Sequence, residues 1–588
     1  MAQDGNRSRG FRPRRSLKGV RFAAAALVFH SEPPARRVPP IQPAQTGEPP
    51  ARRVYDAHVT SMTQAAERVL VPVNPATLEP VGEVEITPLE GLGEILAEAR
   101  LAQEAWARRP LADRQKLLRS VAHTLLAAAD EIAQTIVAET GKPLLEAYTA
   151  DLFVSLDHAA WLARHAECVL RPERVPLRQP HLVHKRGRLL YEPVGVVAIV
   201  SPWNFPLGVP FTQVAAAVAA GNAAVVKPSE LTPVTGAWLE TVFRRAGAPP
   251  GLVRVVQGAG AAIGDALVSH RGVDAVVFTG STEVGRRVGT RAAERLIPAI
   301  LELGGKDPMI VLADADLGRA VEGALWGSFT NCGQVCSGVE RVYVARELHE
   351  PFLAQLAERA QALRIGRGDD PTTDLGPLIS ERQRERVEEV VADAVEHGAE
   401  IVTGGTRPRI ELPGWFFAPT VIDSEPEGAR VRTEETFGPV VTVVKIDDEA
   451  DGVRLANESA FALGASVWTR DRARGRRVAE ALDAGTVWIN DHAYSYGVCQ
   501  APWGGRGASG HGRTHSKHGL YALSHLKYVD TDAGRLRPPW WYPYGGDGVD
   551  GFRGALGALY GRGVRNRARA LARHRAGMAA LARRTLSR

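Results

Sequence analysis

The most constraining feature of this 588-residue chain is the stretch Pro193–Val226, which contains no charged side chain over 34 residues. The stretch is long enough to span a bilayer. It also contains four prolines, at positions 193, 202, 206 and 210, and each of them would interrupt a single membrane helix. We therefore expect a buried strand, a loop, a helix and a second strand within a globular fold.

Apolar runs of strand length alternate with segments of helix length along most of the chain. A helical pattern at about 89–170, with apolar residues every three or four positions, is followed by candidate strands at 194–200, 223–226, 252–256, 275–278 and 309–312. A second series has helices at 347–363 and 381–397 and strands at 341–344, 400–402, 440–445, 465–469 and 487–489. This alternation predicts an α/β protein with a doubly wound parallel sheet and a second α/β domain.

Charge is distributed unevenly along the chain. The formal net charge is +6, but residues 1–61 carry +7 and residues 530–588 carry +8, which leaves −9 for residues 62–529. An acidic central region argues against a nucleic-acid-binding surface on the body of the protein. The four cysteines, at 168, 332, 336 and 499, are too few for a disulfide framework. We therefore expect a reducing, cytoplasmic environment.

The two ends differ in composition from the rest of the chain. Residues 1–61 are rich in Pro, Arg and Gly, which predicts a disordered basic extension, or a protein that starts at Met62. At the other end, a Pro- and aromatic-rich stretch at 538–544 precedes an Arg-rich helical segment at about 553–588. Such a segment either lies on an anionic membrane surface or forms a solvated or inter-subunit arm. Its apolar stripe has few large residues, which favours the arm.

Cys336 and Glu302 are a candidate nucleophile and base. Cys336 lies in the sequence NCGQVCSG (331–338), where Gly333 permits an unusual backbone geometry. A thiol attacks only as the thiolate, so it needs a base or a positive field. Glu302, in LELGGK (301–306), offers a carboxylate. A buried structural cysteine and an ion-paired glutamate are the alternative interpretations of the same residues.

Three further motifs contain polar groups near apolar runs. Asn204 in SPWNFP (201–206) must find hydrogen-bond partners, either as a helix cap or as a donor to an oxyanion. FTGSTEVG (278–285) ends a strand and opens a helix, as a pyrophosphate site requires. KPSE (227–230) places a carboxylate where a ribose diol would bind, although an ordinary solvated turn has the same composition.

The motifs described above occur one after another between residues 201 and 338, and ETFGP (435–439) and PWGGRGASG (502–510) follow them. That order resembles the aldehyde dehydrogenase superfamily from about Val73 to Val529. The combination of GQVC (333–336) with ELGGK (302–306) is highly specific for it. The segments 336–341 and 488–494 look most like the succinate-semialdehyde branch.

The resemblance implies a covalent mechanism. Cys336 would attack the aldehyde, Asn204 and the Cys336 backbone N–H would stabilise the oxyanion, and Glu302 would activate water to hydrolyse the thioester. Members that pass the acyl group to CoA usually lack this carboxylate, and non-catalytic members typically lose the nucleophile or the cofactor contacts. The resemblance therefore favours an enzyme that releases a carboxylic acid.

The resemblance also implies a nicotinamide cofactor. Because a carboxylate at Glu230 would repel a 2′-phosphate, NAD is favoured, with NADP as the alternative. The implied cofactor-binding residues are Trp203, Lys227, Ser229, Glu230, Gly260, Gly280, Ser281, Gly285, Glu435 and Phe437.

The expected architecture is a Rossmann-like NAD-binding domain (62–172 and 192–302), a catalytic domain (303–503), a small β oligomerisation arm (173–191 and 504–529) and a basic tail (530–588). A homodimer or homotetramer is expected.

No metal is expected, because the histidines at 511, 515 and 518 have no fourth ligand or metal-binding spacing. Cys332 is four residues from Cys336; a packing role is favoured over a reversible disulfide.

The sequence leaves the aldehyde open. A semialdehyde such as succinic semialdehyde would need a cation for its remote carboxylate, and the linear sequence does not identify one. An apolar tunnel for medium-chain or aromatic aldehydes is the alternative.

Overall fold

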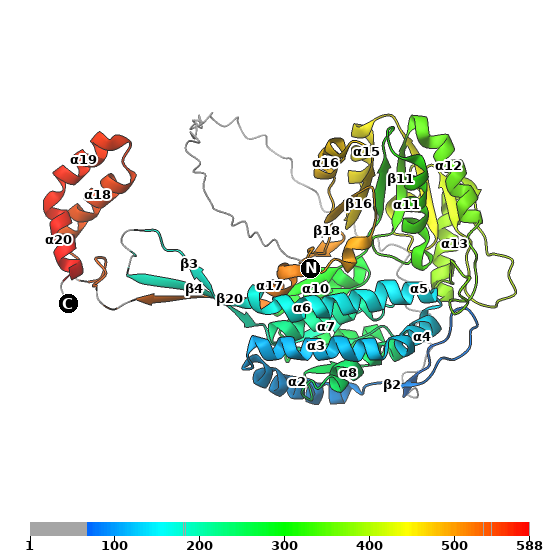
Figure 1. Cartoon of the computed structure of the whole chain (residues 1–588), viewed down its shortest axis with the longest axis horizontal. Coiled ribbons are helices and arrows are strands. Elements are labelled where there is room, and N and C mark those ends of the chain that lie inside the picture. Colours follow the sequence, from blue (N-terminus) through cyan, green and yellow to red (C-terminus); the bar gives the residue numbers. More distant parts are fainter. Residues whose placement is uncertain are drawn as a thin grey trace, which may run out of the picture. The chain divides into compact units, whose positions relative to one another are not determined.

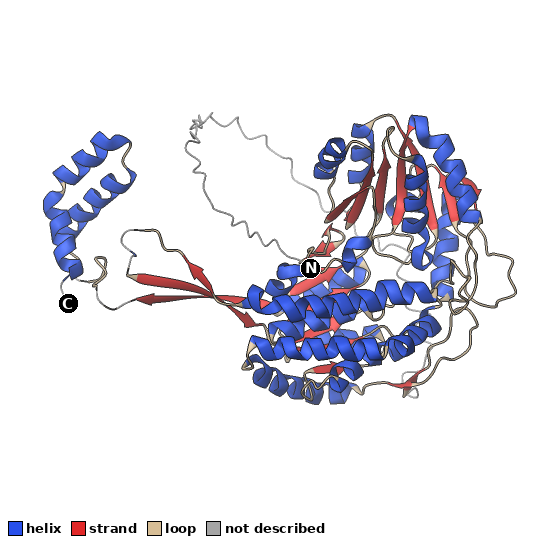
Figure 2. Cartoon of the chain, viewed as in Figure 1, coloured by secondary structure: helices blue, strands red, loops and turns tan. Residues whose placement is uncertain are grey.

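A computed structural model describes residues 68–179, 182, 184–532, 534, 536–542 and 544–586. The expected basic extension at 1–61 and the alternative start at Met62 lie outside the described residues. Figure 1 shows the order of the elements along the chain, and Figure 2 shows the helices and strands.

The helical region expected at about 89–170 is confirmed. Its stripe of Val121, Leu125, Ala128, Ile132 and Ile136 is buried. The stripe continues across a helix boundary at Ala128, where the backbone leaves helical geometry (φ −104°, ψ 10°). The region follows β1 (Val69–Leu70), β2 (Val84–Glu85) and η1 (Leu89–Gly91), and it contains α2 (Leu92–Ala107), α3 (Leu111–Ala127), α4 (Ala129–Thr140), α5 (Leu144–Glu146), η2 (Ala147–Phe153) and α6 (Val154–Leu170).

The first sheet has six strands in the order β19-β9-β8-β5-β6-β7, and all neighbours are parallel except β19 and β9. The chain winds outward from β5 in both directions, so the sheet is doubly wound, as expected. In such a sheet ligands bind at the carboxyl ends of the strands where the winding reverses, here at β5 and β8. The strands are β5 (Val196–Val200), β6 (Ala223–Lys227), β7 (Val253–Val255), β8 (Ala275–Thr279), β9 (Ala299–Glu302) and β19 (Gly510–His511).

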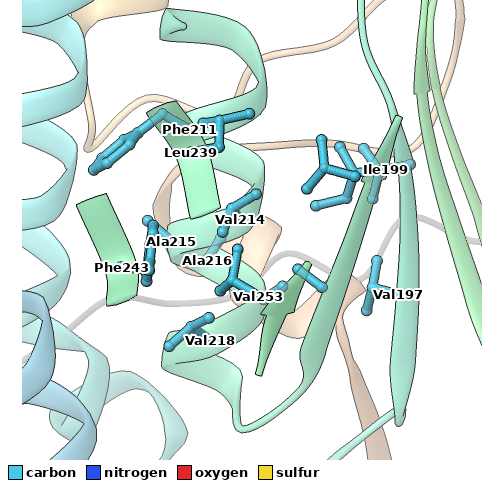
Figure 3. Packing of buried hydrophobic residues seen from close by; sticks show 14 of the residues in the cluster. Val197, Ile199, Phe211, Val214, Ala215, Ala216, Val218, Leu239, Phe243 and Val253 are labelled. Atoms are coloured by element: carbon cyan, nitrogen blue, oxygen red, sulfur yellow. The ribbon is translucent and has the colours of Figure 1, made fainter. Parts of the chain in front are cut away.

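The uncharged stretch is confirmed as β5, a loop, a helix and β6. The helix, α7 (Gly208–Ala220), is buried at every residue. In Figure 3, Phe211, Val214 and Val218 of α7 lie in one apolar cluster with Val197 and Ile199 of β5 and with Leu239 and Phe243. The helices α6 and α3 also contact α7. A charged side chain in α7 would be buried without water, which explains the composition of this stretch. The other helices of this domain are α8 (Pro233–Arg245), η4 (Gly260–Gly264), α9 (Asp265–Ser269) and α10 (Thr282–Glu294).

The second sheet has seven strands in the order β12-β13-β14-β11-β10-β16-β17, parallel except for the pair β12 and β13. It contains the predicted strands and also β13, which the sequence pattern missed. The strands are β10 (Asp307–Val311), β11 (Val339–Ala345), β12 (Glu400–Thr403), β13 (Thr420–Asp423), β14 (Val440–Ile446), β16 (Gly464–Trp468) and β17 (Thr486–Ile489). The helical elements around it are α11 (Leu317–Phe329), η5 (Thr330–Gly333), α12 (Arg346–Gln361), α13 (Glu381–Glu396), α14 (Arg430–Thr433), α15 (Glu449–Asn457), α16 (Arg472–Ala481) and η6 (Tyr494–Gly497).

A three-stranded antiparallel sheet in the order β20-β4-β3 occupies the region expected for the arm, with different bounds. Its strands are β3 (Glu173–Val175), β4 (Lys185–Pro193) and β20 (Ser524–Asp532). The expected segment 504–523 is not part of it. That segment contains β18 (Arg506–Gly507), which pairs with β15 (Phe461–Ala462), then β19, which pairs with β9, and then α17 (Ser516–Ala522). Leu520 and Leu523 are buried in the core of the first domain, which holds this segment there.

The C-terminal residues form three helices, α18 (Gly546–Tyr560), α19 (Gly563–Arg573) and α20 (Arg575–Leu586), so the helical part begins earlier than the expected 553. Within the described residues, no helix combines the length and the apolar character needed to cross a membrane.

Candidate active site

Cys336 follows a strained turn between α11 and β11. Asn331, Cys332 and Gly333 are three successive residues in the left-handed region, with φ of 51°, 56° and 68°. A Cβ on Gly333 would lie 2.0 Å from the carbonyl oxygen of Gly438, so only glycine fits there. The turn leaves Cys336 half-buried. Strain of this kind is maintained only where the surrounding structure enforces it, and it is concentrated at functional sites.

Hydrogen bonds hold this turn in place, and Cys332 belongs to it as a packing residue. The Gln334 side chain donates to the carbonyl of Asn331 (3.0 Å) and accepts from the backbone N–H of Ile379 (2.9 Å). Cys332 is a free cysteine, 2% exposed, in the core of the second domain. The packing role expected for Cys332 is therefore confirmed.

Asn204 lies against the same turn. Its side-chain nitrogen donates to the carbonyl of Gln334 (3.1 Å), and its own carbonyl accepts from the side-chain nitrogen of Asn331 (3.0 Å). Asn204 is 5% exposed. A primary amide has two N–H donors, and this contact uses one of them. The second N–H can serve a substrate oxygen beside Cys336.

Lys142 and Asp151 also belong to this site, and the sequence interpretation missed both. The buried ammonium of Lys142 donates to the carbonyl of Asn204 (2.7 Å) and pairs with Asp151 (3.1 Å). Asp151 in turn accepts from the backbone N–H of Leu207 and Gly208 at the start of α7. The only local signal was a Gly-Lys-Pro break at 141–143 between helical segments.

Glu302 is the last residue of β9 and is 5% exposed. Burial raises the pKa of Glu302 well above its ordinary value, and Arg513 and Thr514 oppose this increase. Burial also raises the pKa of the Cys336 thiol, and the nearby carboxylates of Asp307, Glu435 and Glu302 add to that effect. The thiol is therefore protonated at rest, and a base must remove its proton during attack.

Lys227 and Glu230 are paired where β6 ends. The ammonium lies 2.6 Å from the carboxylate, whose other oxygen accepts from the backbone N–H of Gly260 (3.4 Å). Although burial raises the pKa of Glu230, the charge and hydrogen bond of Lys227 outweigh burial and lower it overall. Ser229 accepts from the backbone N–H of Leu231 (3.2 Å) and so shapes this turn. An ionised carboxylate is thereby held at a strand end, where a ribose diol can donate to it.

The start of α10 provides a second element of a cofactor cradle. Ser281 is its N-cap and accepts from the backbone N–H of Val284. A Cβ on Gly285 would lie 2.3 Å from the side chain of Leu303, and one on Gly280 would lie 2.8 Å from the ring of Phe278. The glycines therefore allow the helix to begin close to the sheet. The first N–H groups of such a helix favour a phosphate.

Glu435 and Phe437 lie on the loop before β14, near Trp203. The carboxylate of Glu435 accepts from the backbone N–H of Gly305 (2.9 Å), and burial, together with Glu340, raises the pKa of Glu435 to about 8. The rings of Trp203 and Phe437 meet edge to face, with centroids 5.4 Å apart.

Three residues that the sequence interpretation missed hold this loop in place. Glu340 accepts from the backbone N–H of Phe437 (3.0 Å), Gln383 donates to the carbonyl of Phe437 (2.9 Å), and Arg386 donates to that of Glu435 (2.9 Å). A cavity of about 560 Å³ adjoins the loop, and its lining includes Trp203, Leu231, Ile379, Ser380, Gln383 and Arg386.

The surroundings of Cys336 are aromatic. Cys336 packs with Leu463, Trp488, Trp503 and Tyr496 in one cluster. Near this cluster, His492 is buried and donates from Nε2 to the carbonyl of Ser337 (2.8 Å). Burial lowers the pKa of His492 to about 4, although the Ser337 contact opposes this.

Comparisons with known proteins agree with this fold. A family model described as the aldehyde dehydrogenase family matches residues 62–529. Betaine aldehyde dehydrogenase 1 of Rhizobium meliloti is 37% identical, covering 81% of this chain and 96% of the relative. The 4,4′-diapolycopene aldehyde oxidase of Methylomonas sp is 38% identical, covering 80% and 88%.

Solved structures agree as well. The NAD⁺ complex of a betaine aldehyde dehydrogenase from Staphylococcus aureus superposes with a TM-score of 0.77 at 35% identity, covering 81% of this chain and 96% of that one. The NAD⁺ complex of an aldehyde dehydrogenase from Bacillus cereus gives 0.76 at 34% identity, covering 79% and 93%. The chain belongs to the aldehyde dehydrogenase family, and it is an NAD(P)-dependent oxidoreductase that acts on aldehydes.

Proposed function

We propose that this enzyme oxidises an apolar or aromatic aldehyde to the carboxylic acid, with Cys336 as the nucleophile. The observation that carries the proposal is the aromatic cluster of Leu463, Trp488, Trp503 and Tyr496 around that thiol. Rings and aliphatic carbon stabilise an apolar substrate by removing it from water. A carboxylate-bearing semialdehyde would need a cation there, and the side chains of this cluster carry none.

Each catalytic residue has a defined part in this proposal. The sulfur of Cys336 bonds to the aldehyde carbon while its proton passes to the Glu302 carboxylate and from there to solvent, and Asn204 donates to the oxygen that becomes negative. Oxidising power at that carbon would come from a nicotinamide held by the cofactor-binding residues, which would accept the hydride. Although burial raises the pKa of Glu302, Arg513 and Thr514 favour its ionised form. As a carboxylate, Glu302 takes a proton from water as the water attacks the thioester, and it returns that proton to the leaving sulfur, which releases the acid and the Cys336 thiol. CoA is not needed, because Glu302 provides the base for hydrolysis.

The chain's own residues fit the cofactor. Glu230 and Lys227 would hold the adenosine ribose, Ser281 and Trp203 the pyrophosphate, and Glu435 the nicotinamide ribose. Gly260 lies beside this pair, and its backbone N–H donates to the Glu230 carboxylate (3.4 Å). Since Glu230 is held ionised, a 2′-phosphate beside it would be repelled, so we propose a preference for NAD over NADP.

A second substrate class is favoured by the same rings. Aromatic faces attract quaternary ammonium groups, and two of the relatives are named as betaine aldehyde and aminoaldehyde dehydrogenases. A cationic aldehyde would therefore use the same cluster.

Initial rates of NADH formation test these assignments. The aldehydes are hexanal, decanal, benzaldehyde, betaine aldehyde and succinic semialdehyde, each with NAD and NADP, and Cys336→Ala is the blank. We expect kcat/KM to rise from hexanal to decanal and to be lowest for succinic semialdehyde. A preference for betaine aldehyde would support the cationic class, and a preference for succinic semialdehyde would overturn the apolar assignment.

A pre-steady-state experiment tests Glu302. Glu302→Gln should release about one NADH per active site in a burst and then stall, because the thioester forms but is hydrolysed slowly. Adding CoA to the wild type should leave the yield of free acid unchanged. A variant without a burst that turns over normally would remove Glu302 from the mechanism.

We also propose that the enzyme assembles with itself through the three-stranded sheet. β20 is exposed along nearly its whole length, including Leu526 (63%), Tyr528 (49%) and Val529 (37%). Such an edge strand is a template for pairing with another chain. Light scattering on the wild type and on Leu526→Asp/Tyr528→Asp tests this: a homodimer or homotetramer should dissociate in the variant.

A further inference from the structure

The C-terminal helices pack through their smallest residues. α18 contacts both α19 and α20, and it does so through Gly551, Gly554 and Gly557, three positions apart. A Cβ on Gly551 would lie 2.5 Å from the side chain of Leu581, and one on Gly557 would lie 2.4 Å from the Cβ of Ala570. The three glycines therefore form the buried face of α18.

The large apolar side chains of α18 lie on the opposite face. They are Val549 (54% exposed), Phe552 (39%), Leu556 (59%), Leu559 (42%) and Tyr560 (74%). At 3.6 residues per turn these five positions fall within an arc of about 100°. A helix of a globular domain buries such a stripe, and this one buries glycine instead. The exposed face is therefore an interaction surface.

Aromatic residues precede α18 in the sequence, and arginines are numerous within α18–α20. Trp541, Tyr542 and Tyr544 immediately before α18 are 57%, 75% and 70% exposed. Residues 546–586 contain two aspartates, Asp547 and Asp550, and Asp550 is bound to His574 (2.6 Å). The same residues contain nine arginines, at 553, 562, 565, 567, 569, 573, 575, 583 and 584.

We propose that α18–α20 are a membrane-surface anchor, with the apolar face of α18 lying in the interface of an anionic phospholipid bilayer. The charge of residues 546–586, +7, complements anionic headgroups and opposes contact between two copies of this face. Trp and Tyr side chains are enriched at the depth of the headgroups. α18 has 15 residues and is about 22 Å long, which is too short to cross the hydrocarbon core of a bilayer. In this proposal it therefore lies along the membrane surface. This proposed membrane location does not depend on which class of aldehyde the enzyme oxidises.

Flotation of the purified full-length enzyme with vesicles tests the anchor. One set of vesicles is pure phosphatidylcholine and the other contains 30% phosphatidylglycerol. We expect binding to the anionic vesicles that weakens as salt rises. Phe552→Ser/Leu556→Ser should weaken this binding at least about tenfold, because it removes two buried apolar side chains from the interface. Both residues are exposed, so the variant should keep its NADH-forming activity and its helical circular dichroism.

A matched control separates this surface from general hydrophobicity. Leu101→Ser/Leu145→Ser changes two leucines that are 70% and 72% exposed elsewhere in the chain, and it should bind vesicles as the wild type does. A second variant, Arg565→Gln/Arg569→Gln/Arg573→Gln, should bind less and lose part of the salt dependence. No flotation with anionic vesicles, or equal flotation of wild type and Phe552→Ser/Leu556→Ser, would overturn the proposal. A fall in oligomer mass in that variant without vesicle binding would instead assign the face to a second copy of the chain.

Discussion

The ammonium of Lys142 lies 2.7 Å from the main-chain carbonyl oxygen of Asn204, and both residues are buried. The same ammonium pairs with Asp151 and lies 4.5 Å from the centroid of the Phe205 ring. Asn331 donates to the same carbonyl. The backbone of Asn204 is thus held from two sides, which leaves its side-chain amide aimed at the turn before Cys336. Lys142 is a positioning residue for the proposed oxyanion donor.

Lys142→Met should lower both stability and kcat. Removing one partner of a buried ion pair leaves the other charge uncompensated, which costs about 3–5 kcal/mol. In Lys142→Met/Asp151→Asn neither member of the pair is charged, so we expect part of the stability to return while kcat stays low. Urea unfolding and steady-state rates measure the two effects. A Lys142→Met enzyme with normal kcat would show that this contact does not position Asn204.

Gly333→Ala should abolish activity and destabilise the protein. The new Cβ would meet the carbonyl oxygen of Gly438 at 2.0 Å, at a residue whose φ is +68°. Gly247→Ala is a matched control, because Gly247 also has a positive φ (+91°) but has nothing within 4 Å of the added Cβ. Its cost should be only the left-handed strain, about 1–2 kcal/mol, with activity retained. Thermal unfolding and the rate of labelling of the Cys336 thiol distinguish the Gly333→Ala variant from the Gly247→Ala variant. Equal effects of the two substitutions would mean that the contact with Gly438 is unimportant.

Replacing Asn204 isolates the oxyanion contact. Asn204→Ala should reduce kcat by roughly 10²–10³, the loss measured for one donor of an oxyanion hole elsewhere. KM should change little, because the contact develops fully only as the oxygen becomes negative. The rate of hydride transfer, measured by stopped flow, should fall by the same factor as kcat. An unchanged hydride-transfer rate would remove Asn204 from the proposed mechanism.

Acid should destabilise the enzyme through His492. Because folding lowers the pKa of His492 from 6.5 to about 4, its contribution to stability is fully present above pH 6.5 and is lost as the pH falls through about 4. This shift corresponds to roughly 3 kcal/mol. His492→Gln should therefore have a flatter dependence of the unfolding midpoint on pH between 7 and 4. Parallel pH profiles for the two proteins would contradict the assignment.

Glu230→Gln tests cofactor selection. It removes the charge that would repel a 2′-phosphate and frees the Lys227 ammonium, now 2.6 Å from the carboxylate. The ratio of kcat/KM for NADP to that for NAD should rise by about tenfold or more, equivalent to about 1.4 kcal/mol. Calorimetric affinities for the two cofactors provide a check that does not depend on turnover. A ratio that does not move would mean that Glu230 does not face the 2′ position.

Local sequence patterns predicted most of the fold. Strand-length apolar runs and helical periodicity depend on residues close together in the chain, and nearly all of the predicted elements are present. The sequence pattern missed β9 and β13. Each is held as a strand by pairing with neighbouring strands of its sheet, which a local pattern does not report. The arm was misplaced at 504–523 because Leu520 and Leu523 pack into a distant core, which no local pattern reports.

The sequence by itself determined the α/β class and, through its motifs, the candidate residues Cys336, Glu302 and Asn204. Only the tertiary structure decided what surrounds them. Lys142 reaches the carbonyl of Asn204 across 62 positions of sequence. The C-terminal arginines and apolar residues are visible in the sequence, but packing decides which face of α18 is buried. There three glycines permit close helix contacts and leave the larger side chains exposed. Periodicity reveals a stripe, whereas the side of the helix that packs depends on the neighbouring helices.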